Sequence, residues 1–179
     1  MSMDEPLYGW SDKKACVKLK GSVMTMQIKL RKAVETDWPA ILEVANAAVP
    51  GLPRENQQWL SNRMRFDQTG YTRRHYVALD AATGDIIGYG AVEGGQEAGR
   101  YRLFIVMSPD LLAAGAGDPL YNQLIADLST LHASSIWARE SARDTALLSF
   151  LSQHGFHETG RFQLPDGGVE VVVMERKLE

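Results

Sequence analysis

The stretch Val106-Met107-Ser108-Pro109-Asp110-Leu111-Leu112-Ala113-Ala114-Gly115-Ala116-Gly117 joins an apolar strand to the start of a helix. Its proline ends strand pairing, and its small residues leave the backbone accessible. The first amides of a helix have no intrahelical partner and lie at the positive end of the helix dipole. A diphosphate could therefore bind over Gly115, Ala116 and Gly117. From these residues alone, a glycine-rich turn that only lets the helix pack on a sheet is an equally good interpretation.

The second half of the chain alternates strands and helices around this stretch. Residues 101–107 form a nearly continuous apolar run, typical of a central strand buried on both faces. Beyond the stretch, the spacing of apolar residues predicts a helix, a short strand, a second helix and a closing hairpin. These elements are expected over 118–131, 135–139, 144–154, and 156–164 with 169–176. Asp144 is the expected cap of the second helix, and Gly155 ends it.

The first half supplies the remaining elements. Residues 27–33 alternate apolar and basic side chains, which indicates a strand with one face in water. The hydroxyl of Thr36 and a proline at position 39 predict the start of a helix that ends before Pro50. A short helix is expected at 55–66, and a hairpin at 76–79 and 86–92. This order of elements is that of an α+β fold, with a mixed, mostly antiparallel sheet and helices on its faces.

Length, charge and cysteine content restrict the function. The chain has 179 residues, enough for one domain, and its formal net charge of −3 disfavours binding to nucleic acid. The single cysteine, Cys16, cannot form an internal disulfide, and no apolar run is long enough to span a bilayer. We therefore expect a cytoplasmic protein that binds neither nucleic acid nor a membrane. The four histidines lack the spacing of a metal site, so no metal is expected. Residues 1–25 show no clear periodicity and are expected to form a flexible leader before a domain at 26–179.

Two motifs resemble those of the GNAT (Gcn5-related N-acetyltransferase) superfamily. The first is a strand, a proline and then Leu112-Ala113-Ala114-Gly115-Ala116-Gly117, where the family has (Arg/Gln)-x-x-Gly-x-(Gly/Ala) at a helix start. The second is a helix that ends in an aromatic residue followed by Gly-Phe, here 144–156 with Phe150 and Gly155-Phe156. The resemblance covers about residues 26–178, and it rests on the joint order and spacing of the motifs.

The resemblance implies an acyl-CoA N-acyltransferase-like fold and acetyl-CoA as cosubstrate. In this family two central strands, here 101–107 and 135–139, splay apart and hold the pantothenyl arm between them. Val106 and Met107 would offer backbone partners to that arm, residues 112–117 would hold the diphosphate, and Asp144 belongs to the second cofactor motif. The acceptor would be an amine of a small molecule or peptide, bound near 49–66, 94–99 and 165–168. The resemblance also allows a homodimer.

Three residues depart from the family pattern. Leu112 replaces an Arg or Gln, and a hydrogen bond to a charged group contributes about 1.5–3 kcal/mol. Asp118 directly follows the glycine loop, where it favours the helix dipole but repels a phosphate. Leu151 replaces a tyrosine that protonates the departing thiolate in many members. Tyr121 is a candidate for that role, although an aromatic packed between helix and sheet is the simpler interpretation.

An amine that attacks the thioester must lose a proton, which requires a general base. Glu93, at the end of a strand, is the first candidate and Glu140 the second; each could equally be a solvated carboxylate at a strand end. Because Leu112 and Leu151 remove two expected polar groups, a CoA-binding pseudoenzyme or regulatory domain is the alternative function. A scaffold whose cleft is closed by side chains is a third.

Overall fold

A mixed sheet of eight strands forms the centre of the part of the chain that the structure describes. The computed structural model describes residues 11–19, 22–48, 73–95, 97–164 and 168–179. The strands are β1 Ser11–Leu19, β2 Ser22–Lys32, β3 Arg73–Asp80, β4 Ile86–Gly94, β5 Arg100–Met107, β6 Ser135–Ser141, β7 His157–Gln163 and β8 Glu170–Lys177. Their order in the sheet is β1-β2-β3-β4-β5-β6-β8-β7, and every neighbouring pair is antiparallel except β5–β6. The expected mixed, mostly antiparallel sheet is confirmed.

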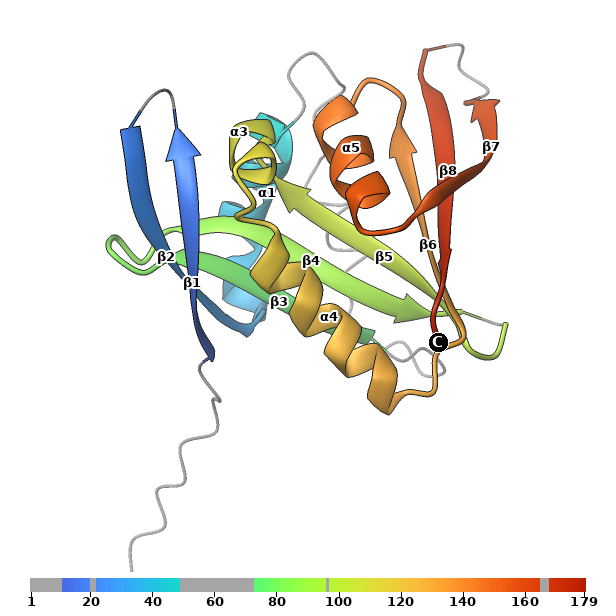
Figure 1. The fold of residues 1–179 in the computed structure, drawn as a ribbon, viewed down its shortest axis with the longest axis horizontal. Coiled ribbons are helices and arrows are strands. Elements are labelled where there is room, and N and C mark those ends of the chain that lie inside the picture. Colours follow the sequence, from blue (N-terminus) through green and yellow to red (C-terminus); the bar gives the residue numbers. More distant parts are fainter. Residues whose placement is uncertain (1–10, 20–21, 49–72, 96, 165–167) are drawn as a thin grey trace, which may run out of the picture.

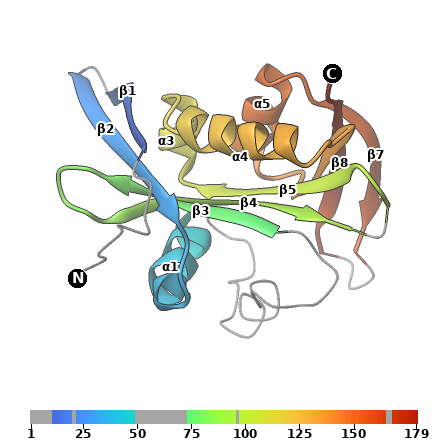
Figure 2. The same ribbon diagram turned by 90° about the horizontal axis from the view of Figure 1, so that it is seen from below.

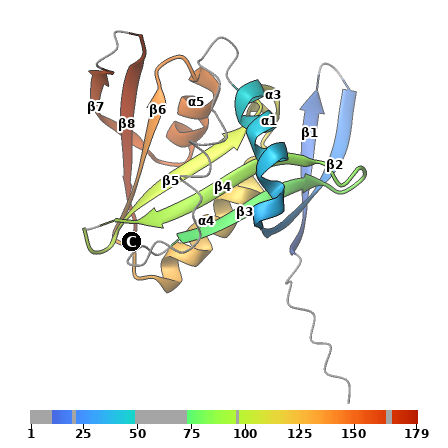
Figure 3. The ribbon, with the colours of Figure 1, turned by 180° about the vertical axis from the view of Figure 1, so that it is seen from behind.

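Helices cover both faces of this sheet. They are the 3₁₀ turn η1 Glu35–Asp37, α1 Trp38–Ala48, α3 Pro109–Ala113, α4 Asp118–Thr130 and α5 Thr145–Gln153. Seen along the sheet, α1 lies on one face and α3, α4 and α5 lie on the other (Figure 2). The view from behind has α1 in front of the strands and α4 beyond them (Figure 3). Among the described helices, none combines the length and the apolar character needed to cross a membrane.

The apolar run of β5 is explained by a core on each face of the strand. Leu103, Ile105 and Met107 belong to the larger core under α4 and α5. Val106 belongs to the smaller core, against which Phe104 packs together with residues of α1. Successive side chains of a strand point to opposite faces, so a strand with both faces covered has no need of polar positions. The prediction of a central strand buried on both faces is confirmed.

The 3₁₀ turn η1, directly before α1, is held by a buried carboxylate. Asp37 is 6% exposed, and its two carboxylate oxygens accept hydrogen bonds from Arg31 Nη1 and Nη2, each at 2.7 Å. It also accepts the backbone N–H of Val34 at 2.8 Å. Burial by itself raises the pKa of Asp37, but the hydrogen bonds from Arg31 and Val34 outweigh burial and the pKa is lowered. The expected cap was the hydroxyl of Thr36; in the structure Thr36 lies inside η1, and the Asp37 carboxylate instead accepts the N–H of Val34, the N-cap residue of that turn.

The N-terminal segment differs from the expected leader. Residues 11–19 form β1, which pairs with β2 from Ser11↔Leu30 to Leu19↔Ser22, and β2 begins at Ser22 rather than at 27. Only two residues separate the strands in the sequence, a length typical of β-hairpins. A hairpin buries fewer side chains than a central strand, so its hydrophobic pattern is weak. The predicted helix at 55–66 and the turn residues 165–167 lie outside the described residues.

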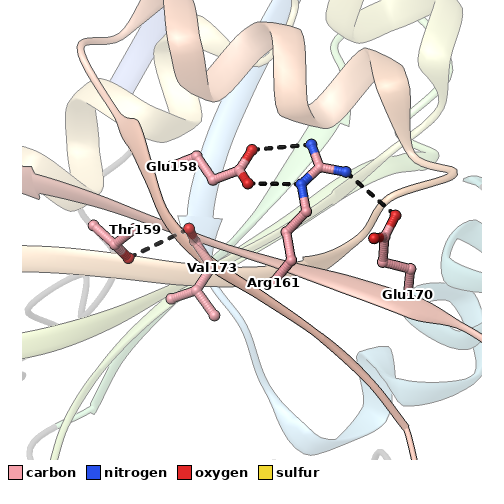
Figure 4. Close-up of polar contacts among 5 residues, drawn as sticks. All are labelled: Glu158, Thr159, Arg161, Glu170 and Val173. Atoms are coloured by element: carbon pink, nitrogen blue, oxygen red, sulfur yellow. Dashed lines mark hydrogen bonds and ion pairs between the residues drawn. The ribbon is translucent and has the colours of Figure 1, made fainter.

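The β7–β8 hairpin closes the sheet at one edge; one ion pair of Arg161 lies within β7 and a second crosses to β8 (Figure 4). Arg161 Nε lies 2.6 Å from Glu158 Oε1, and Arg161 Nη1 lies 3.2 Å from Glu170 Oε2. Thr159 Oγ1 donates to the carbonyl of Val173 at 3.4 Å. The three charged side chains are exposed, so solvent screens their attraction and the two ion pairs contribute little to stability.

We expect substitution of Gly90 by alanine to destabilise the fold. Gly90 lies on β4 beneath α4, where an added Cβ would come within 2.9 Å of Leu124 Cδ1 and 3.0 Å of Leu120 Cγ. Overpacking of this kind costs about 1–3 kcal/mol. Gly160 on β7 is the matched control, because an added Cβ would have no atom within 4 Å. Urea denaturation should give about 1–3 kcal/mol for G90A and at most about 0.5 kcal/mol for G160A. Equal effects would contradict the packing of α4 on β4.

Candidate functional site

The parallel strands β5 and β6 separate before they end. Their pairing runs from Arg100↔Ser135 to Arg102↔Trp137 and stops there. Each strand continues on its other side: β5 pairs with β4 as far as Met107↔Gly88, and β6 pairs with β8 as far as Ser141↔Val171. Within the described residues, the β5 edge from 103 to 107 therefore has no ladder partner on the β6 side (Figure 1). The expected splay of the two central strands is confirmed.

Val106 and Met107, the expected backbone partners of the cofactor arm, lie at the open end of β5. Their side chains are 8% and 2% exposed and point into opposite cores. Only their backbone groups can therefore face the gap. In a β-strand the groups on an unpaired edge are donors and acceptors that need a partner.

The connection between β5 and α4 is more helical than expected. Residues 109–113 form the short helix α3, in which Ser108 is the N-cap and its Oγ accepts the N–H of Leu111 at 3.4 Å. A turn follows, in which Gly115 has φ +79°. Glycine reaches this left-handed conformation without strain, whereas other residues rarely do. The connection expected as a proline and a small-residue loop thus contains a short helix, because Ser108 and Pro109 together form a favourable helix start.

Most amides of this turn form hydrogen bonds within the turn itself. Ala114 donates to Asp110, Gly115 to Leu112, Ala116 to Leu111 and Asp118 to Gly115, at 2.9–3.2 Å. Leu112 likewise donates to Ser108 at 3.0 Å. The expectation that residues 112–117 hold a diphosphate through open amides is therefore wrong for Leu112, Ala114, Gly115 and Ala116. In the described part of the chain, the backbone N–H groups of Gly117 and Leu120 have no such backbone acceptor.

Leu112 is buried in the core and packs against Gly117 at the end of the turn. It is 5% exposed and belongs to the core cluster under α4 and α5. An added Cβ on Gly117 would lie 2.9 Å from Leu112 Cδ2 and 2.9 Å from Phe150 Cε2. The absence of a side chain at Gly117 thus lets Leu112 of α3 and Phe150 of α5 pack against the start of α4, which is a structural reason for glycine at this position.

The second motif positions α5. The Asp144 carboxylate accepts the N–H of Leu147 at 3.0 Å and so caps the helix, as predicted. Burial raises the pKa of Asp144, and the hydrogen bond from Leu147 only partly offsets this. Leu151 is 1% exposed in the core and offers no polar group. The carboxylate of Asp144 thus has a capping role, independent of any cofactor.

Tyr121, the candidate proton donor, lies on α4 and packs against α5 and β8. It is 2% exposed, and its hydroxyl oxygen accepts a hydrogen bond from Arg176 Nη1 at 2.6 Å. Its ring contacts Phe150 and Phe156 edge to face. Burial raises the pKa of Tyr121, and the charge of Arg176 opposes that rise. These contacts give Tyr121 the packing role that was its alternative interpretation.

Glu93 lies in a row of side chains that crosses the sheet. Cross-strand pairs place Arg73 opposite Glu93, Glu93 opposite Arg102, and Arg102 opposite Trp137. Glu93 Oε1 lies 3.0 Å from Arg73 Nη2, and the Arg102 guanidinium lies 5.4 Å from the Trp137 ring centroid. Since Arg102↔Trp137 is the last β5–β6 pair, this row marks the point where the two strands diverge. Sequence analysis missed Arg73 and Arg102, because only the register brings them to Glu93.

The row lies on the α1 face of the sheet, and Glu140 lies on the other face. Tyr89, Ala91 and Glu93 are alternate residues of β4 and so lie on the same face of the sheet. Tyr89 and Ala91 belong to the smaller core, against which α1 packs. Glu140 alternates with Ile136 and Ala138, which belong to the opposite core. It is partly exposed on the β6 segment beyond the last pair with β5, where it pairs with Val172. The two candidate bases therefore approach the gap from opposite faces.

His75 is next to this row and on the same face. Burial and the nearby charge of Arg73 lower the pKa of His75 to about 4. Its ring lies edge to face with Tyr89, at a centroid distance of 6.4 Å. In the described part of the chain, no group of three or more His, Cys, Asp or Glu side chains is arranged to hold a metal ion.

Comparison with known proteins identifies the fold. No family model and no curated protein sequence matches the chain. A putative phosphinothricin N-acetyltransferase resembles it with a TM-score of 0.69 and 20% identity, covering 85% of this chain and 99% of that one. The Escherichia coli ribosomal-protein-S18-alanine N-acetyltransferase gives 0.65 and 17%, covering 84% and 93%. A GNAT superfamily phosphinothricin acetyltransferase from Sinorhizobium meliloti in complex with AcCoA gives 0.66 and 21%, covering 84% and 88%.

The chain therefore has the GNAT fold, and the resemblance that its two motifs indicated is confirmed at the level of the fold. Nearly the whole length of each of these three proteins is matched, so the similarity is not limited to the cofactor motifs.

The lowered pKa of His75 predicts a pH-dependent stability. An unfolded histidine has a pKa near 6.5, so between pH 6.5 and 4 the unfolded chain binds a proton that the folded chain does not. Stability is therefore lost as the pH falls through this range, by at most about 3 kcal/mol from His75. Denaturant unfolding at pH 7, 5.5 and 4.5 should show a shallower pH dependence in H75Q than in the wild type. Identical slopes in the two proteins would contradict a buried, neutral His75.

Proposed function

We propose that this protein is an acetyl-CoA-dependent N-acetyltransferase, which transfers an acyl group to an amine of a small molecule or peptide. The observation that carries the proposal is the end of the β5–β6 ladder at Arg102↔Trp137, in a chain with the GNAT fold. A structural neighbour has this fold in complex with AcCoA. The unpaired edge of β5 offers backbone groups to the amides of a pantetheine arm, with Val106 and Met107 at its far end.

The diphosphate of the cofactor would lie at the head of α4. Gly117 and Leu120 supply N–H groups there, and the helix dipole favours a negative charge. Internal hydrogen bonds leave Leu112, Ala114, Gly115 and Ala116 to shape the turn rather than to donate. The proposed diphosphate site is therefore smaller than the six-residue motif suggested.

The reaction would be direct attack of the acceptor amine on the thioester carbonyl. A general base takes a proton from the amine, and Glu93 is the first candidate because its row marks the divergence of β5 and β6. Backbone amides near Met107 would polarise the carbonyl as charge develops on its oxygen.

The departing thiolate has little need of a proton donor. A thiol has a pKa of about 8.5, so the thiolate is a fair leaving group near neutral pH without an acid at position 151. Leu151 is therefore compatible with transfer, and Tyr121 is not required.

The proposal also covers the acceptor amine, the cellular location and the oligomeric state. Two proteins of similar structure are named as acetyltransferases of phosphinothricin and of a ribosomal-protein alanine, so this fold accommodates quite different amines. Most of the segments expected to shape the acceptor site lie outside the described residues. A cytoplasmic location and a homodimer are proposed on the grounds given by the sequence.

The second candidate function is a CoA-binding domain without transferase activity. The burial of Leu112 and the internal hydrogen bonds of the turn favour it, because both reduce the contacts available to the diphosphate. The two functions differ in one observable, which is release of free CoA thiol when an amine is present.

Calorimetry with acetyl-CoA, followed by a thiol-release assay over a panel of amines, tests both candidates. We expect binding, thiol release with at least one amine, and a drop in kcat of about 10²–10⁴-fold in E93Q with an unchanged Kd for acetyl-CoA. E140Q tests the second candidate base, and we expect it to retain activity because Glu140 lies on the opposite face of the sheet from Glu93. Binding without thiol release would favour the second candidate, and full activity in E93Q would exclude Glu93 as the base. No heat and no thermal shift at millimolar acetyl-CoA would contradict both functions.

A further inference from the structure

The carboxylate of Asp118 lies over the glycine turn at the head of α4. Asp118 is the first residue of α4, and its side chain is 52% exposed. Its Oδ2 lies 3.4 Å from the place where a Cβ on Gly115 would be. Its Oδ1 lies 3.3 Å from Nε2 of His154. A negative charge is thus held next to the groups that would receive the diphosphate.

His154 is built into the end of α5 so that it meets this carboxylate. It is the C-cap of α5, and its Nδ1 lies 2.8 Å from the carbonyl oxygen of Phe150. A carbonyl oxygen can only accept, so Nδ1 carries a hydrogen. A carboxylate also only accepts, so a hydrogen on Nε2 as well satisfies both contacts at once. Both ring nitrogens of His154 thus face an acceptor, the Phe150 carbonyl on one side and the Asp118 carboxylate on the other.

Two aromatic rings fix the position of the imidazole. The ring centroids of Tyr121 and Phe150 lie 4.2 Å and 4.3 Å from that of His154, and His154 is only 19% exposed. The Tyr121 ring is in turn held by the hydrogen bond from Arg176. These ring contacts hold the imidazole in a fixed orientation toward Asp118.

We infer that Asp118 and His154 form a charge-compensated pair that sets how strongly the head of α4 binds the diphosphate of the acyl donor. The inference rests on the proposed function. Without His154, the carboxylate would face a diphosphate within the screening length of about 8 Å and repel it. With His154 in place, the carboxylate is directed toward α5 and its charge is offset. His154 is therefore a positioning residue, and it acts through Asp118.

A double-mutant cycle with two ligands tests this inference. Calorimetry on the full chain would compare the wild type, D118N, H154Q and the double variant, with acetyl-CoA and with S-acetylpantetheine, which lacks the diphosphate. We expect D118N to bind acetyl-CoA about 3–10-fold more tightly than the wild type, and H154Q about 3–10-fold more weakly. In the D118N background the effect of H154Q should fall below about twofold, because the charge that it offsets is absent. With S-acetylpantetheine all four proteins should bind alike.

Three results would overturn the inference. An effect of H154Q that is the same in both backgrounds would show that His154 only supports the fold. Weaker binding of acetyl-CoA by D118N, or equal effects of D118N on the two ligands, would show that Asp118 does not repel the diphosphate. D118N changes no packing volume, so its comparison between ligands remains decisive even if thermal unfolding shows H154Q to be unstable. Binding of acetyl-CoA by none of the four proteins would instead remove the proposed function itself.

Discussion

The end of backbone pairing between β5 and β6 at Arg102↔Trp137 is the constraint on which the proposed chemistry depends. Two parallel strands at the centre of a sheet would normally pair along their whole length, because each unmade backbone hydrogen bond in a buried place costs free energy. Here α5 and the α3–α4 turn lie at the open end, while β4 and β8 hold each strand on its far side. A ligand with its own amide groups can satisfy the exposed edge, and this is the chemistry of a pantetheine arm.

The turn before α4 combines two demands that partly conflict. Its internal hydrogen bonds and the packing of Leu112 on Gly117 make it rigid, and the same contacts reduce the number of amides that remain for a ligand. Rigidity favours binding by lowering the entropy lost on association, whereas fewer donors disfavour it. Asp118 adds a negative charge at the same place, and His154 offsets it. The affinity for a diphosphate is therefore set by a balance among a few neighbouring residues.

Much of the fold could be predicted from the sequence, because β5, α4, α5 and the β7–β8 hairpin have strong apolar periodicity and clear capping or turn residues. The β1–β2 hairpin was missed because its pattern is weak, and α3 was missed because glycine and alanine residues suggested a loop. Glu93 could be singled out as a carboxylate at a strand end, but its partner Arg73 is 20 positions away and only the register places the two side by side. The Asp118–His154 contact likewise needed the packing of α5 on α4.

Residue-resolved amide exchange with and without acetyl-CoA tests the central claim most directly, because it reports on the backbone groups themselves. The account predicts slower exchange, on addition of acetyl-CoA, at the amides of 103–107 that face β6 and at Gly117 and Leu120. Amides already bonded within the turn, such as those of Ala114 and Ala116, should change little. Saturating acetyl-CoA that leaves the β5 edge unprotected, or that protects only a different surface, would contradict the account.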